Sequence, residues 1–226
     1  MPRSTHVVGS PGTGKTHWIR EQSVGAVDTY GISKVNVCSL TKAAATEAAD
    51  RLDLPDKQVG TLHSFCYREV CDRDTIFETD KDAIKAWNEH CGSPAWQMKQ
   101  PDEHPLFQSY GKHRSMLVPP LTTGDAAFAA RFEEWKQGEG VIDFTDMLTR
   151  GLDLEFMPGR PSILYIDEAQ DMSRLEAKLL RQWARHMEEI VIVGDPYQNL
   201  YEFRGSDAAA MLPSHILEQG AVVLPQ

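Results

Sequence analysis

The chain has 226 residues, of which 41% are hydrophobic and 25% charged, and it carries a formal net charge of −10. This length and hydrophobic content suit one large domain with a sizeable core, with or without an insertion. No run approaches the roughly 20 consecutive apolar residues that a membrane-spanning helix needs. Residues 1–5 are too few and too polar for a signal peptide before the first motif begins, so a cytoplasmic location is expected.

The cysteine count argues against a disulfide-stabilised protein, and the net charge argues against nucleic-acid binding through bulk electrostatics. Four cysteines in this length indicate reduced thiols rather than a disulfide framework. Cys66, Cys71 and Cys91 lie near His63 and His90, but their spacing matches no established zinc pattern, so we expect free thiols. An acidic chain does not bind nucleic acid through bulk electrostatics, so any nucleic-acid surface has to be local.

The clearest motif lies near the N-terminus. Residues 9–16 read GSPGTGKT, which fits the phosphate-loop pattern, with an apolar strand at 6–8 before it and a helix after it. Glycines allow the tight turn, and a helix N-terminus favours an anion; a chance glycine-rich turn is the alternative. In such loops the lysine, here Lys15, reaches the β- and γ-phosphates, and the hydroxyl of Thr16 binds Mg²⁺. The predicted nucleotide contacts are Gly9, Pro11, Gly12, Thr13, Gly14, Lys15, Thr16 and His17.

The next elements continue an alternation of strands and helices. Residues 34–40 are β-branched and mostly apolar, which predicts a strand. The alanine-rich residues 41–52 predict a helix with Thr41 as N-cap. Residues 59–60 predict a short strand, and a helix is expected from Thr61 to about Asp72.

The character changes between residues 72 and 140, which we interpret as a small, mostly helical insertion within a domain formed by residues 1–71 and 141–226. Helices are predicted at 80–90 and 125–137, and the apolar stripe of Phe128, Phe132 and Trp135 indicates core packing. The proline-rich residues 93–120 are expected to form a loop or partly disordered segment.

Regular alternation resumes after the insertion. Asp143 is a candidate N-cap of a short helix over 143–148, and residues 173–186 predict an amphipathic helix with Leu175, Leu179 and Trp183 on one side. Residues 162–166 and 190–193 are continuous apolar runs, and 221–224 predict a last strand. Such strands indicate an α/β fold whose parallel sheet is covered by helices on both faces.

Two strands deliver polar residues at their carboxyl ends, where ligands of open α/β sheets bind. After residues 163–166 comes the sequence DEAQD, in which Asp167 is placed to hold Mg²⁺ and Glu168 to deprotonate the attacking water. The alternative is an acidic helix start that stabilises the helix dipole.

The segment after the strand at 190–193 carries a second group of candidates. Gln198 is placed to hydrogen-bond a γ-phosphate. Tyr201, Phe203 and Arg204 follow it, and aromatic side chains beside an arginine suit the stacking of single-stranded nucleic acid. A packed loop with an aromatic plug is the alternative.

The order of these motifs resembles that of superfamily 1 DNA helicases of the UvrD/Rep/PcrA type. Residues 9–16 resemble motif I, 40–44 motif Ia, 60–65 the G-T-F-H-S-F segment and 143–148 the D-F-x-D-L-L segment; 167–171 resemble motif II and 194–205 motif III. The resemblance implies a RecA-like P-loop NTPase fold with ATP and Mg²⁺ as cofactors. It also implies catalytic roles for Lys15, Glu168 and Gln198, metal binding by Thr16 and Asp167, and contacts to single-stranded DNA by Thr41, Lys42, His63, Phe65, Tyr201, Phe203 and Arg204.

This sequence also departs from the family pattern. Ser39 stands where the family has a DNA-stacking aromatic, and no adenine-reading glutamine precedes residue 9. The family's second RecA-like domain, which carries its arginine fingers, is expected in sequence beyond Gln226 or on a partner chain. We therefore expect the chain alone to bind ATP·Mg²⁺, to hydrolyse it slowly and not to unwind DNA. A non-motor nucleotide-dependent DNA-binding module and a small-molecule phosphotransferase are the rival interpretations.

Overall fold

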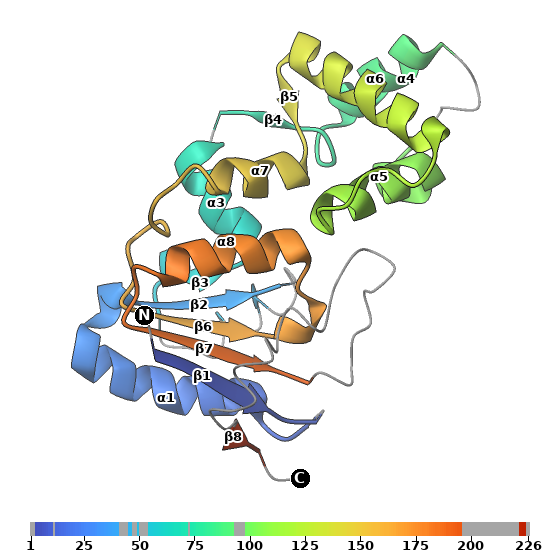
Figure 1. Ribbon diagram of the computed structural model, residues 1–226. Coiled ribbons are helices and arrows are strands. Elements are labelled where there is room, and N and C mark those ends of the chain that lie inside the picture. Colours follow the sequence, from blue (N-terminus) through green and yellow to red (C-terminus); the bar gives the residue numbers. More distant parts are fainter. Residues whose placement is uncertain are drawn as a thin grey trace.

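The computed structural model describes residues 3–10, 12–40, 45, 46, 49, 54–71, 73–92, 98–195 and 222–224. Its central sheet contains β1 (Arg3–Val8), β2 (Val35–Ser39), β3 (Val59–Gly60), β6 (Ile163–Asp167), β7 (Glu189–Gly194) and β8 (Val222–Val223). The strands follow the order β3-β2-β6-β7-β1-β8, and every pairing is parallel (Figure 1). The predicted α/β fold with a parallel sheet is confirmed.

Helices cover both faces of this sheet because its strands are apolar on both sides. On one face α1 (Lys15–Tyr30) packs its Ile19 into a cluster with Ile163 and Tyr165 of β6. On the other face Leu164 and Ile166 of β6 pack into a cluster with α3 (Leu62–Val70), α7 (Phe144–Gly151) and α8 (Arg174–Ala184) (Figure 1). This alternation follows from the two-residue period of a strand.

Several helix starts are fixed locally by side-chain caps. The hydroxyls of Thr61, Thr122 and Ser173 and the carboxylate of Asp143 each accept the amide of the residue three positions on, in reciprocal capping boxes. The predicted N-cap at Asp143 is therefore confirmed. Short 3₁₀ turns, η1 (Ile32–Lys34), η2 (Asp56–Gln58) and η5 (Ala169–Asp171), flank strands of the sheet.

The predicted insertion has its own aromatic core. It contains β4 (Thr75–Ile76), α4 (Lys81–Cys91), η4 (Pro101–Glu103), α5 (Pro105–Ser115) and α6 (Thr123–Glu139). β4 pairs in parallel with β5 (Val141–Ile142), which follows the predicted insertion directly. The predicted stripe on α6 is buried, with Phe132 1% exposed. Its rings pack around Trp87 of α4, which is fully buried, together with Phe77 and Phe107.

The expectation of a loop or disorder over residues 93–120 is wrong for much of that range. Pro105 occupies the first turn of α5, where its missing amide is not needed, and the His104 ring accepts the Leu106 amide at 3.3 Å. Phe107 and Tyr110 then bury one face of the helix. Residues 93–97 lie outside the described part, as do most of residues 41–52, of which 45, 46 and 49 are helical.

A buried network of charges joins the insertion to α7. Lys136 of α6 and Asp143 at the start of α7 are each 3% exposed at their side chains, and Nζ lies 2.5 Å from Oδ2. Arg114 of α5 contacts Asp143 at 2.8 Å and Asp146 at 2.7 Å, and Lys136 also reaches Asp146 at 2.7 Å. We call these four residues the ion-pair network. Its carboxylates, with Glu133, are close enough together for a metal ion, but Arg114 and Lys136 already form ion pairs with all three.

The cysteines and the helix lengths bear on two further expectations. All four cysteines are free thiols. Within the described ranges, no helix is long and apolar enough to cross a membrane.

Candidate nucleotide site

The loop between β1 and α1 has the backbone that its glycines predict. Gly12 and Gly14 adopt left-handed conformations, with φ of 77° and 81°. This region is unfavourable for other L-residues by about 1–2 kcal/mol, so glycine is favoured at both positions. Lys15 and Thr16 then open α1, directly after Gly14 as N-cap.

Three other predicted nucleotide contacts, Gly9, Thr13 and His17, make contacts within the protein. The Gly9 amide donates to the carbonyl of Gly194 at 3.2 Å, which ties the loop to the end of β7. The Thr13 hydroxyl donates to the Ser10 carbonyl at 2.7 Å. His17 is exposed, with its ring 3.4 Å from the Glu21 carboxylate one turn along α1. Pro11, also predicted as a nucleotide contact, lies outside the described residues.

The N-terminus of α1 differs from most of the other helix starts that the structure describes. No side chain of the described residues caps it, and its first turn contains no acidic residue. By contrast, α3, α4, α6, α7 and α8 all begin with a side chain that accepts a backbone amide. Unpaired first-turn amides and the positive end of the helix dipole together make a phosphate site.

Two oxygen ligands meet where a divalent cation is predicted. The Thr16 hydroxyl donates to Asp167 Oδ2 at 3.2 Å, across the gap between α1 and the end of β6. Burial and then the charge of Glu168 raise the pKa of Asp167 to about 6, and the Lys15 ammonium opposes the shift. Hydroxyl and carboxylate oxygens are the ligands that Mg²⁺ prefers, so these residues fit the ion.

Glu168 sits beside this pair in an unusual conformation. Its φ of 55° is left-handed, and its amide donates to Asp167 Oδ1 at 3.0 Å. Its carboxylate accepts the side-chain amide of Gln170 at 2.7 Å, and the other end of that amide accepts the backbone N–H of Asp195 at 3.0 Å. Sequence reasoning overlooked Gln170; its position within DEAQD was the signal that could have found it.

The predicted DNA contacts are only partly described. Thr41, Lys42, Gln198, Tyr201, Phe203 and Arg204 lie outside the described residues, so their predicted roles stay predictions. Phe65 was expected to contact DNA, but its side chain lies in the core. Its ring is 2% exposed and packs in the cluster under α3, α7 and α8, because that face of α3 points into the core.

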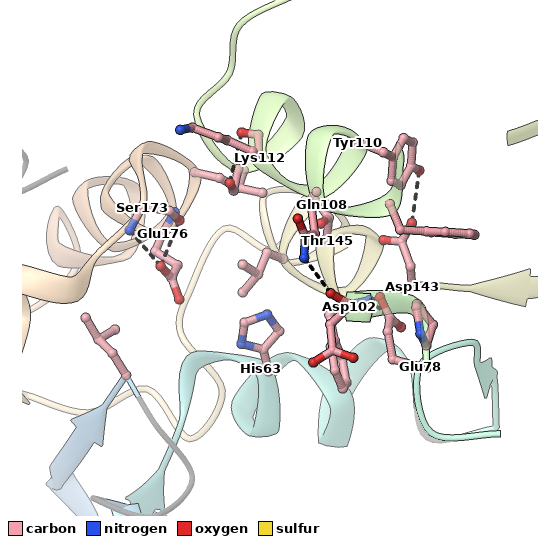
Figure 2. Close-up of a pocket in the computed structure, with 18 of the residues that line it drawn as sticks. His63, Glu78, Asp102, Gln108, Tyr110, Lys112, Asp143, Thr145, Ser173 and Glu176 are labelled. Carbon is pink, nitrogen blue, oxygen red and sulfur yellow. Dashed lines mark hydrogen bonds between the residues drawn. The ribbon is translucent and has the colours of Figure 1, made fainter. Parts of the chain in front are cut away.

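His63 lines a cavity of about 710 Å³ whose walls come mainly from α3, α5, α7 and α8. His63 comes from α3, Gln108 and Tyr110 from α5, and Glu176 from α8 (Figure 2). Burial lowers the pKa of His63. The centroid of its ring lies 5.7 Å from that of Phe144, in a T-shaped arrangement.

Acidic groups dominate the charged lining of this cavity. It contains five carboxyl side chains and one lysine: Glu78, Asp102, Asp143, Asp171, Glu176 and Lys112. Such a lining disfavours a phosphate backbone. The exposed aromatic beside His63 is Phe144, at 39%, which the sequence analysis did not select for DNA contact.

Several relatives of this chain are named as helicases. YjcD of Bacillus subtilis, whose name describes an ATP-dependent DNA helicase, is 26% identical over 255 residues, covering 94% of this chain and 32% of YjcD. The ATP-dependent DNA helicase PcrA of Staphylococcus aureus is 24% identical over 91% of this chain and 33% of its own length. The crystal structure of Pif1 helicase from Candida albicans aligns with a TM-score of 0.45 at 17% identity, covering 99% of this chain and 36% of that chain.

The chain therefore spans about a third of the length of the first two relatives. The expected resemblance to UvrD/PcrA-type proteins is confirmed by these relatives. A family model described as an AAA domain matches residues 1–204, and the chain belongs to that family.

Proposed function

We propose that the chain is the RecA-like ATP-binding domain of a DNA helicase. The observation that carries this proposal is the open N-terminus of α1, which follows two left-handed glycines and places Thr16 3.2 Å from Asp167. In this proposal the first-turn amides and Lys15 bind the β- and γ-phosphates. Mg²⁺ supplies charge neutralisation at the phosphates when it is bound, and Thr16 and Asp167 hold it.

Glu168 is the proposed base for the attacking water, and Gln198 the proposed sensor of the γ-phosphate. Glu168 is half-buried, and a donated hydrogen bond holds its carboxylate next to Asp167. A positioned base contributes about 10²–10⁴-fold to hydrolysis. An arginine finger contributes about 10³–10⁵-fold in phosphate-loop enzymes, and in the proposed helicase a second RecA-like domain supplies it. We therefore expect slow hydrolysis by this chain alone.

The proposed partner is single-stranded DNA. We propose that Thr41, Lys42, Tyr201, Phe203, Arg204 and His63 lie along its path. Because the lining around His63 is acidic, bases or an edge of the strand fit there better than phosphates. We also propose that residues 72–140 form a subdomain inserted into the ATP-binding domain, since their aromatic cluster is distinct from the two clusters that flank the central sheet.

Nucleotide binding tests the first part of the proposal. Lys15→Ala should lower the affinity for a fluorescent ATP analogue in Mg²⁺ by at least about 10-fold, because it removes the cation next to the phosphates. Lys85→Ala is the matched control, since Lys85 is an exposed lysine whose ion pair with Glu89 lies within α4. Equal affinities of the two variants would remove the loop from its proposed role.

Hydrolysis and DNA binding test the rest. Glu168→Gln should keep nucleotide affinity and lose residual hydrolysis, whereas surviving hydrolysis would require another base. The rival is a non-motor nucleotide-dependent DNA-binding module. The test measures ATP turnover with and without DNA after a second RecA-like domain is supplied. Stimulation of turnover by DNA would exclude this rival, and turnover that is independent of DNA would favour it.

A further inference from the structure

A single buried side chain joins the proposed catalytic base to the end of β7. Gln170 lies in η5 and is 4% exposed. Its Nε2 donates to Glu168 Oε2 at 2.7 Å, and its Oε1 accepts the Asp195 amide at 3.0 Å. Both ends of its amide are therefore used, one on each of two segments that are far apart in the sequence.

The chemistry of the two neighbours requires an amide at this position. The ionised carboxylate of Glu168 only accepts hydrogen bonds, and the backbone N–H of Asp195 only donates one. A glutamate at 170 would keep the acceptor for Asp195 but face Glu168 with a second negative charge. A leucine would supply neither hydrogen bond.

We propose that Gln170 is a positioning residue, which fixes the Glu168 carboxylate and links it to the segment that begins at Asp195. This inference rests on the proposed function, because it takes Glu168 as the base of ATP hydrolysis. Gln170 does not contact the nucleotide in this proposal; it acts through Glu168.

Through Gln170, the orientation of the Glu168 carboxylate depends on the segment after β7. Asp195 precedes Gln198 by three residues in the sequence, and Gln198 is the proposed γ-phosphate sensor. A displacement of Asp195 changes the Oε1 contact, and the rigid amide plane passes that change to Nε2 and Glu168. Nucleotide or DNA contacts on this segment would thereby adjust the orientation of the base.

Amide hydrogen exchange tests the link without requiring activity. Gln170→Leu should raise exchange at the Asp195 amide by at least about 10-fold, because the buried acceptor is lost. Gln170→Glu should keep that amide protected. The matched control is Gln182→Leu, which removes another glutamine that makes two hydrogen bonds, to the carbonyls of Leu152 and Leu154. Unchanged protection of Asp195 in Gln170→Leu would overturn the link.

Single-turnover hydrolysis tests the positioning role. Gln170→Glu should slow hydrolysis of bound ATP by about 10-fold, less than Glu168→Gln does, while nucleotide affinity stays within about twofold of wild type. A wild-type rate, or an affinity that falls in parallel with the rate, would overturn the role. If wild type and Glu168→Gln hydrolyse ATP equally, the proposed base fails and the positioning role fails with it, whereas exchange at Asp195 still decides whether the link exists.

Discussion

Replacing Asp143 with asparagine would isolate the charge at the centre of the ion-pair network. Asparagine is as good an N-cap as aspartate, so the start of α7 is retained. What is lost is the partner of Lys136, whose ammonium is 3% exposed and lies 2.5 Å from Asp143. Breaking a buried ion pair is unfavourable by about 3–5 kcal/mol. Because Asp146 stays 2.7 Å from Lys136, we expect the lower end, about 3 kcal/mol.

Urea denaturation measures this loss directly. The matched control is Asp80→Asn, which makes the same change at the N-cap of α4, where the carboxylate accepts two backbone amides. We expect the control to stay within about 0.5 kcal/mol of wild type. The loss in Asp143→Asn should persist in 0.5 M salt, because buried charges are screened little. Equal stability of the two variants would show that the network does not stabilise the junction.

Three further changes probe the loop, the cavity and the aromatic groups near it. Gly12→Ala should weaken ATP·Mg²⁺ binding by about 5–30-fold, because Gly12 has a left-handed φ. The control Gly138→Ala lies in an open position on α6 and should stabilise the chain by up to about 1 kcal/mol. Equal ATP affinities of the two variants would contradict the expected role of Gly12. Burial and then Asp143 raise the pKa of Glu78 to about 8, so this carboxyl contributes stability below its ordinary pKa that is lost as pH rises through 8. Unfolding free energies of wild type relative to Glu78→Gln should fall between pH 5 and pH 9, and a constant difference would refute the assignment. Phe144→Ala should weaken single-stranded DNA binding with little loss of stability, whereas Phe65→Ala should destabilise the fold by about 3–5 kcal/mol; the reverse pattern would restore Phe65 as the DNA contact.

Sequence reasoning succeeded where the relevant physics is local. Continuous apolar runs predicted the buried parallel strands, because both faces of this sheet are covered. The stripe at Phe128, Phe132 and Trp135 predicted a core face from helical periodicity alone. Asp143 was recognised as a cap because capping depends on residues only three positions apart.

It failed where a residue's role depends on distant partners. Arg114 lies 29 residues from Asp143 in the sequence, and no local sequence pattern predicts their contact. The prolines near α5 suggested a loop, although Pro105 is well tolerated in a first helical turn. Phe65 was selected from a motif that mixes aromatic and polar residues, but which face of α3 meets the core is decided by α7 and α8.

The hydrogen bonds around Glu168 also explain how it can hold an unfavourable backbone. A left-handed conformation disfavours this residue by about 1–2 kcal/mol, and a hydrogen bond to a charged group contributes about 1.5–3 kcal/mol, so the Gln170 contact alone can offset the strain. Without the Gln170 contact, the backbone at Glu168 is free to relax. The unfavourable strain and the favourable hydrogen bond are then lost together. Gln170→Glu, which keeps the acceptor for the Asp195 amide, can therefore stay close to wild type in global stability while the Glu168 carboxylate moves. For that reason hydrolysis and local amide exchange, and not the free energy of unfolding, are the measurements that reveal what Gln170 does.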